Sequence, residues 1–530
     1  MAGNKIIKIG ADKGNLPQAR AFVEKILGKR FVNASIASDA MLLFEALFRE
    51  IVSQVDDSSA ELEISRARKL GHTDIKMTFP GKRFSLHEGD VSSNPGAKTI
   101  EAFSDKISCS YQGGYNVVRI SVSQSAWAFI LPNLVAVVAA VIVGIALRLT
   151  LGDTGQQVLA EEWITPLEKL FTNAVLMIGA PMTLFSLLKN VTDSFIVAER
   201  HSSSRKLFAN SVASSAIVIV LALVMGFLVA QSILAASGVT ESFDLGFANW
   251  SLASAVDQII PSSIITPFET ISPIPMIVVA LLIAAALGSM GQTFSTVKRA
   301  IDVCYDLFSN ILKIVMAAFP VACFLLFLHI LLAKGGITVF LEILYIAVIV
   351  FVCTVPVLIV YALKLRVRGI PLREFIGKLW PLVKENIAIG SVIDAVPFNT
   401  QYCEKNLGIK RQRLEKELPV LAQTSLDGNC FILMLLATIY IFIANCDVSW
   451  INIAVIAIIV LFLSFGAPNQ PGSILIGMLI ILAYLHSDIA VSLAPCFELF
   501  CGGLQNILNV ISSVVTVAEN ECREEKHPSA

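Results

Sequence analysis

Asp427 and Gly428 lie in the stretch QTSLDGNC, inside a run that is otherwise apolar from residue 418 to 444. A carboxylate at mid-membrane depth costs about 2.5 to 3.5 kcal/mol on insertion scales, which makes such a residue a functional candidate. A neighbouring glycine lets a helix unwind and present oxygen atoms, which hard cations prefer as ligands. Asp427 is therefore a candidate functional residue, and a cation is one ligand that it could bind. The alternatives are a short polar loop between two helices and a hydrogen-bonded structural carboxylate.

A second polar group lies near the C-terminus, in the stretch GGLQNILNV. Gln505 and Asn509 share one face if this stretch is helical, and Asn506 is adjacent. Their amides donate and accept hydrogen bonds, so they suit a neutral polar group of a ligand. Asn509 is also a candidate oxygen ligand for the ion at Asp427. The alternative for Asn509 is a hydrogen bond between packed helices.

The composition predicts a helical multi-pass membrane protein. Of 530 residues, 55% are hydrophobic and 15% are charged, and the mean hydropathy is +0.73. Such a chain is too apolar for a soluble globular protein and too long for one domain. Residues 1–124 carry charges at ordinary soluble density, so we expect a cytoplasmic α+β domain there. A membrane domain would follow over 125–521, and a short cytoplasmic tail over 522–530. No cleavable signal is recognised at the N-terminus.

The cysteines give no sign of a metal site or a disulfide framework. All ten are scattered singly, without CxxC or Cys/His spacing. No nucleophile and base set appears either, so an enzyme is not expected. We expect no organic cofactor and no nucleic-acid partner; the expected partners are a small solute and membrane lipids.

Windows of about 20 apolar residues give the candidate spans. Regular windows cover residues 126–149, 166–188, 207–234, 273–287, 311–332 and 340–363, and windows broken by Gly, Pro or polar residues cover 375–398, 418–444, 451–485 and 493–517.

The basic residues predict the orientation. They gather in alternate connections, at Lys189, Arg200, Arg205 and Lys206, then Lys298 and Arg299, then Lys364, Arg366, Arg368 and Arg373. The long connection 235–273 contains no Lys or Arg. By the positive-inside rule, both termini are expected to be cytoplasmic.

Two interrupted segments are interpreted as re-entrant hairpins. Segment 375–398 is followed by the basic stretch NLGIKRQR, so it should begin and end on the cytoplasmic side and turn near Gly390 and Ser391. Segment 451–485, broken at GAPNQPG, would be its outward-facing counterpart, with Pro468 at the tip. Paired broken segments are typical of a transporter substrate site.

The order of hairpin, interrupted helix, hairpin and polar last helix resembles the dicarboxylate/amino acid:cation symporters, the glutamate transporter homologue family. The similar stretches are PLEKLFTNAVLMIGAPMTLFSLL, IIPSSIITPF, AVPFNTQYCEKNLGIKR, SLDGNC, GAPNQPGS and GGLQNILNV, within residues 126 to about 521. The resemblance implies eight transmembrane helices plus two re-entrant hairpins. It also implies a homotrimer and elevator-type transport.

The resemblance also suggests site residues. Asp427 matches the family's sodium-associated Asp, and Ser425, Asn509 and Ser513 join it as candidate sodium ligands. The positions that hold substrate and sodium in the family are occupied here by Gly502, Gln505, Asn506, Asn509 and Ser513. Of these five, only Asn509 is the residue that the family has. Ser513 stands where the family has a second sodium Asp, so fewer sodium ions and proton coupling are both open.

The first hairpin retains one serine, Ser391, of the family's serine-rich tip. Asp394 on its return arm either holds a substrate amine, carries a proton, or caps the arm or pairs with Lys384. With these two residues, the candidate substrate ligands are Ser391, Asp394, Pro468, Gln505, Asn506 and Asn509. Glu498, which matches an acidic family position, is interpreted as mainly structural.

No Lys or Arg occurs between Lys416 and Arg523. The fixed cation that would pair with a second carboxylate is therefore missing from this region, and acidic amino acids or dicarboxylates are poor candidates. Half-helix N-termini at both hairpin tips can still hold one carboxylate. We predict a symporter for another small amino acid or carboxylate, coupled to sodium or protons. The alternative is a transporter-derived solute sensor that signals through the N-terminal domain.

In that domain, periodicity predicts helices over 16–27 and 38–55 and strands over 62–67, 75–79 and 117–122. The stretch LLFEALFREI resembles a helix of histidine-kinase-like ATPase domains, with Glu45 kept but Arg49 in place of the magnesium-binding Asn. No glycine-rich segment follows. The resemblance implies a regulatory role without ATP hydrolysis.

Overall fold

The computed structural model describes residues 6–10, 12–27, 34–54, 61–69, 72–81, 107–112, 114–123, 127–200, 202–237, 259–288, 294–333, 336–443, 450–468, 470–485 and 488–526. The chain divides into two compact units, Met1–Phe129 and Ile130–Ala530.

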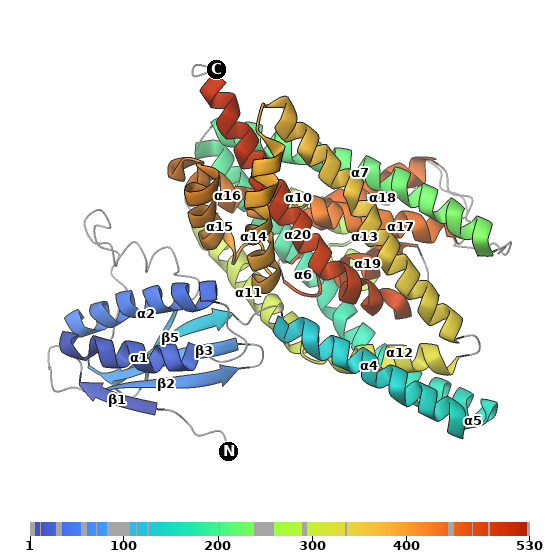
Figure 1. Ribbon diagram of the computed structural model, residues 1–530, viewed down its shortest axis with the longest axis horizontal. Coiled ribbons are helices and arrows are strands. Elements are labelled where there is room, and N and C mark those ends of the chain that lie inside the picture. The colour runs from blue at the N-terminus through green and yellow to red at the C-terminus, as the bar shows by residue number, and fades with distance from the viewer. Residues whose placement is uncertain are drawn as a thin grey trace. The chain divides into compact units, whose positions relative to one another are not determined.

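The first unit is a small α+β fold. Its antiparallel sheet has the order β1-β2-β3-β5-β4, from β1 (Ile6–Gly10), β2 (Glu61–Lys69), β3 (His72–Pro80), β4 (Ile107–Gln112) and β5 (Tyr115–Ser123). After the 3₁₀ turn η1 (Lys13–Asn15), helices α1 (Leu16–Leu27) and α2 (Ala34–Gln54) pack on one face of the sheet (Figure 1).

The core of this unit follows the two periodicities of its elements. Phe44 and Phe48 on α2 are four residues apart and fully buried, as are Ile64 on β2 and Ile75 on β3. The predicted helices and strands are confirmed. Strands β1 and β4 were not predicted, because they are short edge strands; in β4 (ISCSYQ) most of the residues are polar.

The second unit is helical. Its longer helices are α4 (Trp127–Thr150), α6 (Thr165–Arg200), α7 (Ser202–Ser237), α10 (Pro273–Gly288), α11 (Phe294–Met316), α12 (Phe319–Leu332), α13 (Gly336–Val367) and α20 (Asp488–Lys526). Short elements are α5 (Asp153–Val158), η3 (Leu159–Ile164) and α9 (Thr266–Glu269). Among the described residues, six helices are long and apolar enough to cross a membrane, or seven if one bent pair counts as a span.

That bent pair is α11 and α12, and it differs from the single span predicted over 311–332. The two helices meet at 48°, in a break around Ala317 and Ala318. Pro320 is at the start of α12 and has no N–H, and its ring would clash with the carbonyl of Met316 in a continuous helix. Helix α11 therefore ends at Met316.

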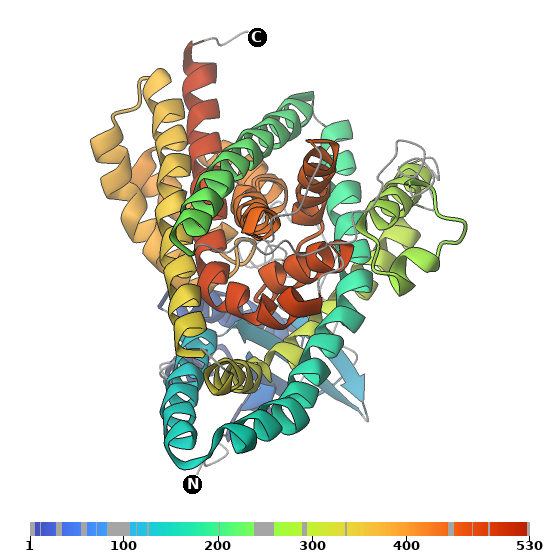
Figure 2. The ribbon, with the colours of Figure 1, turned by 90° about the vertical axis from the view of Figure 1, so that its right-hand side faces the viewer.

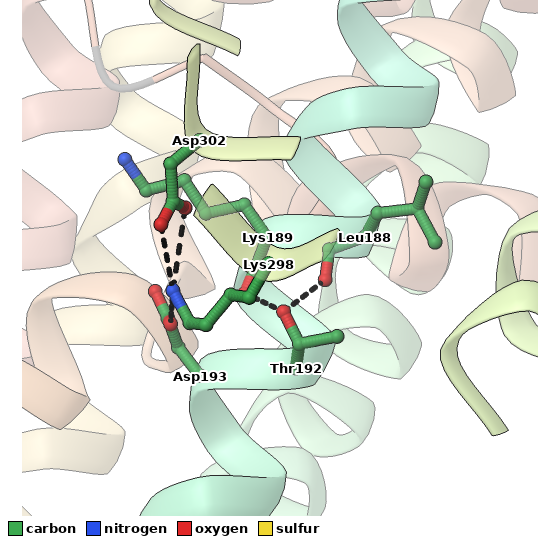
Figure 3. A network of polar contacts seen from close by, with 6 residues as sticks. All are labelled: Leu188, Lys189, Thr192, Asp193, Lys298 and Asp302. Carbon is green, nitrogen blue, oxygen red and sulfur yellow. Dashed lines mark hydrogen bonds and ion pairs between the residues drawn. The ribbon is translucent and has the colours of Figure 1, made fainter. Parts of the chain in front are cut away.

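A polar network joins α6 to α11 (Figure 3). The Nζ of Lys298 on α11 lies 2.7 Å from Asp193 of α6 and 3.0 Å from Asp302 on its own helix. Thr192 donates its hydroxyl hydrogen back to the carbonyl of Leu188, at 2.7 Å. The cation thus links two carboxylates from adjacent helices.

Two pairs of short helices follow the hairpin pattern. The first is α14 (Leu372–Ile389) with α15 (Val396–Tyr402), which runs on into η5 (Cys403–Leu407). The expected turn is confirmed at Gly390, whose φ of 74° is in the left-handed region that favours glycine. The side-chain amides of Asn386 and Asn399 exchange two hydrogen bonds between the arms, at 2.7 and 3.1 Å. The second pair is α18 (Trp450–Phe465) with α19 (Ser473–Tyr484).

Between the pairs lie α16 (Arg411–Thr424) and α17 (Asp427–Ile443). Helix α17 lies among α7, α18, α19 and α20 and contacts each of them (Figure 2). It is buried along almost its whole length, including Asp427 and Asn429 near its start. A polar helix start is therefore held at the centre of this unit.

Candidate functional site

The site is built around the break between α16 and α17. Helix α16 ends at Thr424, and Ser425, with φ −91° and ψ 68°, departs from helical geometry. Ser211 of α7 donates its hydroxyl hydrogen to the freed Thr424 carbonyl, at 2.8 Å. Asp427 then begins α17, where the unpaired N–H groups of the first turn favour a negative charge.

The Asp427 carboxylate is fully buried, with 0% of the residue exposed. Its Oδ2 accepts hydrogen bonds from Ser214 Oγ at 2.8 Å, Tyr361 Oη at 2.8 Å and Ser512 Oγ at 2.6 Å. Its Oδ1 accepts one from Ser215 Oγ at 2.7 Å. These donors come from α7, α13 and α20. Both oxygens of the buried carboxylate are thereby hydrogen-bonded.

Two further residues complete the network around this carboxylate. Ser425 Oγ lies 2.7 Å from Ser512 Oγ. Because Ser512 gives its hydrogen to Asp427, Ser425 is the donor in that pair. On the other side, Lys364 Nζ donates to Ser214 Oγ at 2.8 Å. The groups bonded directly to the carboxylate are all hydroxyl oxygens, which is the ligand chemistry that hard cations prefer.

The other two predicted ion ligands are engaged elsewhere. Asn509 Oδ1 accepts from the Gly428 backbone N–H at 2.7 Å, and its Nδ2 donates to Asn429 Oδ1 at 2.9 Å. Ser513 donates to the carbonyl of Asn509 on its own helix, at 2.9 Å. The structure therefore brings Ser425 to Asp427 through Ser512. Asn509 is bonded to the backbone of Gly428, next to Asp427, and Ser513 is bonded to the backbone of its own helix, α20.

Amides and hydroxyls extend from this centre to both hairpins. Asn429 of α17, bonded to Asn509, donates to Ser473 Oγ at the start of α19, at 3.1 Å. Asn506 Nδ2 of α20 donates to the Gly390 carbonyl at the first hairpin turn, at 2.9 Å, next to Ser391. Gln505 is buried on α20 between these contacts. The last helix thus bonds directly to the tip of the first hairpin, and it is linked to the start of α19 through Asn429.

Two predicted substrate ligands lie apart from this chain of contacts. Asp394 is half-buried, and its backbone N–H donates to Ser391 Oγ at 3.3 Å. Within the described residues, its carboxylate has no hydrogen bond or ion pair, with Lys384 or any other group. Pro468 is buried, but its neighbours bond to the early helices: Ser186 of α6 donates to the Ala467 carbonyl at 3.4 Å, and Gln470 pairs with Ser309 of α11.

Glu498 of α20 corrects one expectation about the hairpin tips. Its Oε1 accepts from the Gly472 N–H at 2.8 Å, and its Oε2 accepts from the Leu475 N–H at 3.1 Å. The carboxylate of Glu498 therefore occupies the N-terminus of α19, where a solute carboxylate was expected to bind. This supports the structural interpretation of Glu498 and leaves the first hairpin as the candidate carboxylate site.

The four hydroxyl donors to Asp427 are not among the residues predicted from the sequence. Ser214 and Ser215 are adjacent polar residues in the apolar stretch SVASSAIVIV, which was the available signal. Ser512 precedes the chosen Ser513 by one residue. Tyr361 lies in a mainly apolar span and has no distinguishing pattern around it.

Long apolar helices, two pairs of short arms and a buried carboxylate among hydroxyls define a multi-pass membrane transport protein. Residues 130–518 match the model of the Sodium:dicarboxylate symporter family, and the chain belongs to this family of transporters, which are not enzymes. A C4-dicarboxylate transport protein of Rhodopseudomonas palustris (strain BisB18) is 23% identical over 414 residues. That alignment covers 74% of this chain and 89% of the relative.

Proposed function

We propose that this protein is a cation-coupled secondary transporter that moves a small organic solute by an elevator-type mechanism. The observation that carries the proposal is the buried Asp427 carboxylate, which begins a broken central helix and is surrounded by hydroxyls from three other helices. Burying an ionisable group at membrane depth costs free energy, and a helix can begin without such a group.

The co-transported ion, sodium in the leading form of the proposal, is assigned to Asp427 with the hydroxyl oxygens of Ser214, Ser215, Ser425 and Ser512. Carboxylate and hydroxyl oxygens suit a hard monovalent cation, and the hydroxyls can reorient as the ion arrives. Because Asn509 and Ser513 are bonded to backbone atoms, we place them outside this ligand set. A proton is the alternative ion.

The solute is assigned to the space between the first hairpin turn and α20, with Ser391, Gln505, Asn506 and Asn429 as its polar contacts. Asp394, whose carboxylate has no hydrogen bond or ion pair among the described residues, is the candidate contact for an amine on the solute. The relative from Rhodopseudomonas palustris is named for C4-dicarboxylates. For this chain we propose a different solute, an amino acid or carboxylate with one negative charge, because no Lys or Arg occurs between Lys416 and Arg523.

The full architecture in this proposal has eight transmembrane helices and two re-entrant hairpins, in a homotrimer. The arms α15, α18 and α19 have 7, 16 and 12 residues, fewer than the roughly 20 that a membrane crossing needs. This supports the hairpin interpretation. Helices α16, α17 and α20 would move with both hairpins against the early spans.

Solute uptake into proteoliposomes tests the function. Amino acids with one carboxylate, and monocarboxylates, would be offered under an inward sodium gradient, an inward proton gradient, or neither. We expect uptake that requires one gradient and that falls about tenfold or more in Asp427→Asn, which removes the ionic ligand. Asp153→Asn, at an exposed position, is the matched control and should transport normally.

Three results would contradict parts of this proposal. An unchanged gradient dependence in Asp427→Asn would remove the ion site from Asp427. Solute binding without flux under any gradient would favour the sensor. Strong uptake of a dicarboxylate would refute the solute assignment.

For the N-terminal unit we propose a regulatory role without ATP hydrolysis. Glu45, the residue kept from the ATPase-like pattern, lies 3.1 Å from Arg20 of α1 in an ion pair. The Glu45 carboxylate is therefore already engaged by a side chain of the same unit. ATP hydrolysis by the purified full-length protein above the level of a Glu45→Gln variant would refute this role.

A further inference from the structure

Lys364 approaches the proposed ion site from α13. Its Nζ donates to Ser214 Oγ at 2.8 Å and lies 5.7 Å from the centre of the Tyr361 ring. Tyr361 precedes Lys364 by three residues, so both side chains project from the same side of α13. Both also contact the group around Asp427.

The direction of the hydrogen bonds follows from the chemistry of the groups. An ammonium has no acceptor, so Ser214 must accept from Lys364. Ser214 then has its own hydrogen free, and it donates this hydrogen to Asp427 Oδ2 at 2.8 Å. A single hydroxyl therefore connects the positive charge of Lys364 to the buried negative charge.

The neighbouring basic residues are not placed in this way. Arg368, in the turn just after α13, forms an ion pair with Glu519, at 2.7 Å. Arg366 is exposed. Among the described basic residues that follow the sixth predicted span, Lys364 is the one bonded to the hydroxyls around Asp427.

We propose that Lys364 is a tethered counter-cation of Asp427 that competes with the co-transported ion and lowers its affinity. This inference rests on the proposed ion site. The two positive charges are the Lys364 ammonium and a cation bound at Asp427. At a separation of about 5 Å and an effective dielectric constant of about 20, their repulsion is large enough to lower the affinity for the cation roughly a hundredfold. Lys364 also uses one of the two lone pairs of Ser214, an oxygen assigned to the ion.

The consequence is a site that stays neutral when the ion leaves. With the ion bound, Lys364 must move away or tolerate the repulsion; without the ion, Lys364 partly neutralises Asp427 through Ser214. The buried carboxylate is then never left without a nearby positive charge during the return of the empty transporter.

Sodium titration of thermal unfolding tests the proposal on the purified full-length protein. The unfolding midpoint would be followed against sodium chloride, with choline chloride holding the ionic strength constant. Lys364→Gln removes the charge, Lys364→Arg retains it, and Arg366→Gln is the matched control on the same helix. We expect the half-saturating sodium concentration to fall about tenfold or more in Lys364→Gln. It should stay within about threefold of the unmodified protein in the other two variants.

Asp427→Asn separates this proposal from the ion site itself. If Asp427→Asn abolishes the sodium response while Lys364→Gln leaves the half-saturating concentration unchanged, Lys364 is not a competitor although the ion site stands. If Asp427→Asn retains the response, the ion site fails as well. If sodium stabilises neither the unmodified protein nor Lys364→Gln, both fail. Should Lys364→Gln not fold, Lys364→Met keeps the apolar stem and gives the same test.

Discussion

At the scale of single residues, hydroxyl groups stabilise a carboxylate that is fully buried. Asp427 begins a helix and accepts hydrogen bonds from three serines and a tyrosine. Hydroxyl oxygens can both donate to a carboxylate and, after rotation, bind a cation. The same groups therefore stabilise the buried carboxylate, and in the proposed ion site they would also suit the cation.

Tyr361→Phe is expected to lower the free energy of unfolding by about 1 to 3 kcal/mol, because it removes one donor from a buried charged acceptor. The measurement is the thermal unfolding midpoint of the purified protein. Tyr345→Phe, on the same helix but 56% exposed, should leave the midpoint unchanged. Equal midpoints for both variants would show that Tyr361 does not stabilise Asp427.

At the scale of elements, the site depends on how closely helices approach at glycines. A Cβ added to Gly428 would lie 2.2 Å from the carbonyl oxygen of Gln505 on α20. A Cβ on Gly226 of α7 would lie 2.7 Å from the Cβ of Thr438 on α17. Side chains at these two positions would hold α17 away from the helices that supply its hydroxyl donors.

Gly428→Ala is therefore expected to destabilise the protein by about 1 to 3 kcal/mol or more, because backbone must shift to fit the methyl group. The sodium response of the unfolding midpoint should weaken as well, since α20 carries Ser512. Gly503→Ala, also on α20, meets nothing within 4 Å and is the control. Retention of both the midpoint and the sodium response in Gly428→Ala would contradict the close approach of α17 and α20.

At the scale of the helical unit, ion pairs gather at one end of α20. Arg368, just after the end of α13, and Arg413 of α16 lie 2.7 Å from Glu519 and Glu521, respectively. Both arginines belong to connections predicted to be cytoplasmic by their positive charge. This favours a cytoplasmic C-terminus, and the even number of crossings in the proposed topology places the N-terminus on the same side.

Epitope tags at both termini are expected to bind antibody only after cells are permeabilised. A third tag between residues 238 and 258, in the connection without Lys or Arg, should bind on intact cells and serves as the control. Binding at either terminus on intact cells would overturn the orientation, because it would require an odd number of crossings or an inverted insertion.

The sequence by itself determined the apolar helices, the turn at Gly390 and the placement of one carboxylate within a membrane-length run. Hydropathy, glycine and proline are local signals, so a single sequence carries them. The sequence also shows that no Lys or Arg occurs between Lys416 and Arg523.

Only the tertiary structure decided which groups meet at Asp427. Its donors lie 213, 212, 66 and 85 residues away along the chain. Ser512 and Ser513 are adjacent in sequence, yet a helix turns by about 100° per residue, so one reaches the carboxylate and the other bonds back along α20. Lys364, which the sequence marks only as part of a basic loop, reaches the same site because α13 packs beside α7. Such convergence depends on helix rotation and crossing, which no local pattern encodes.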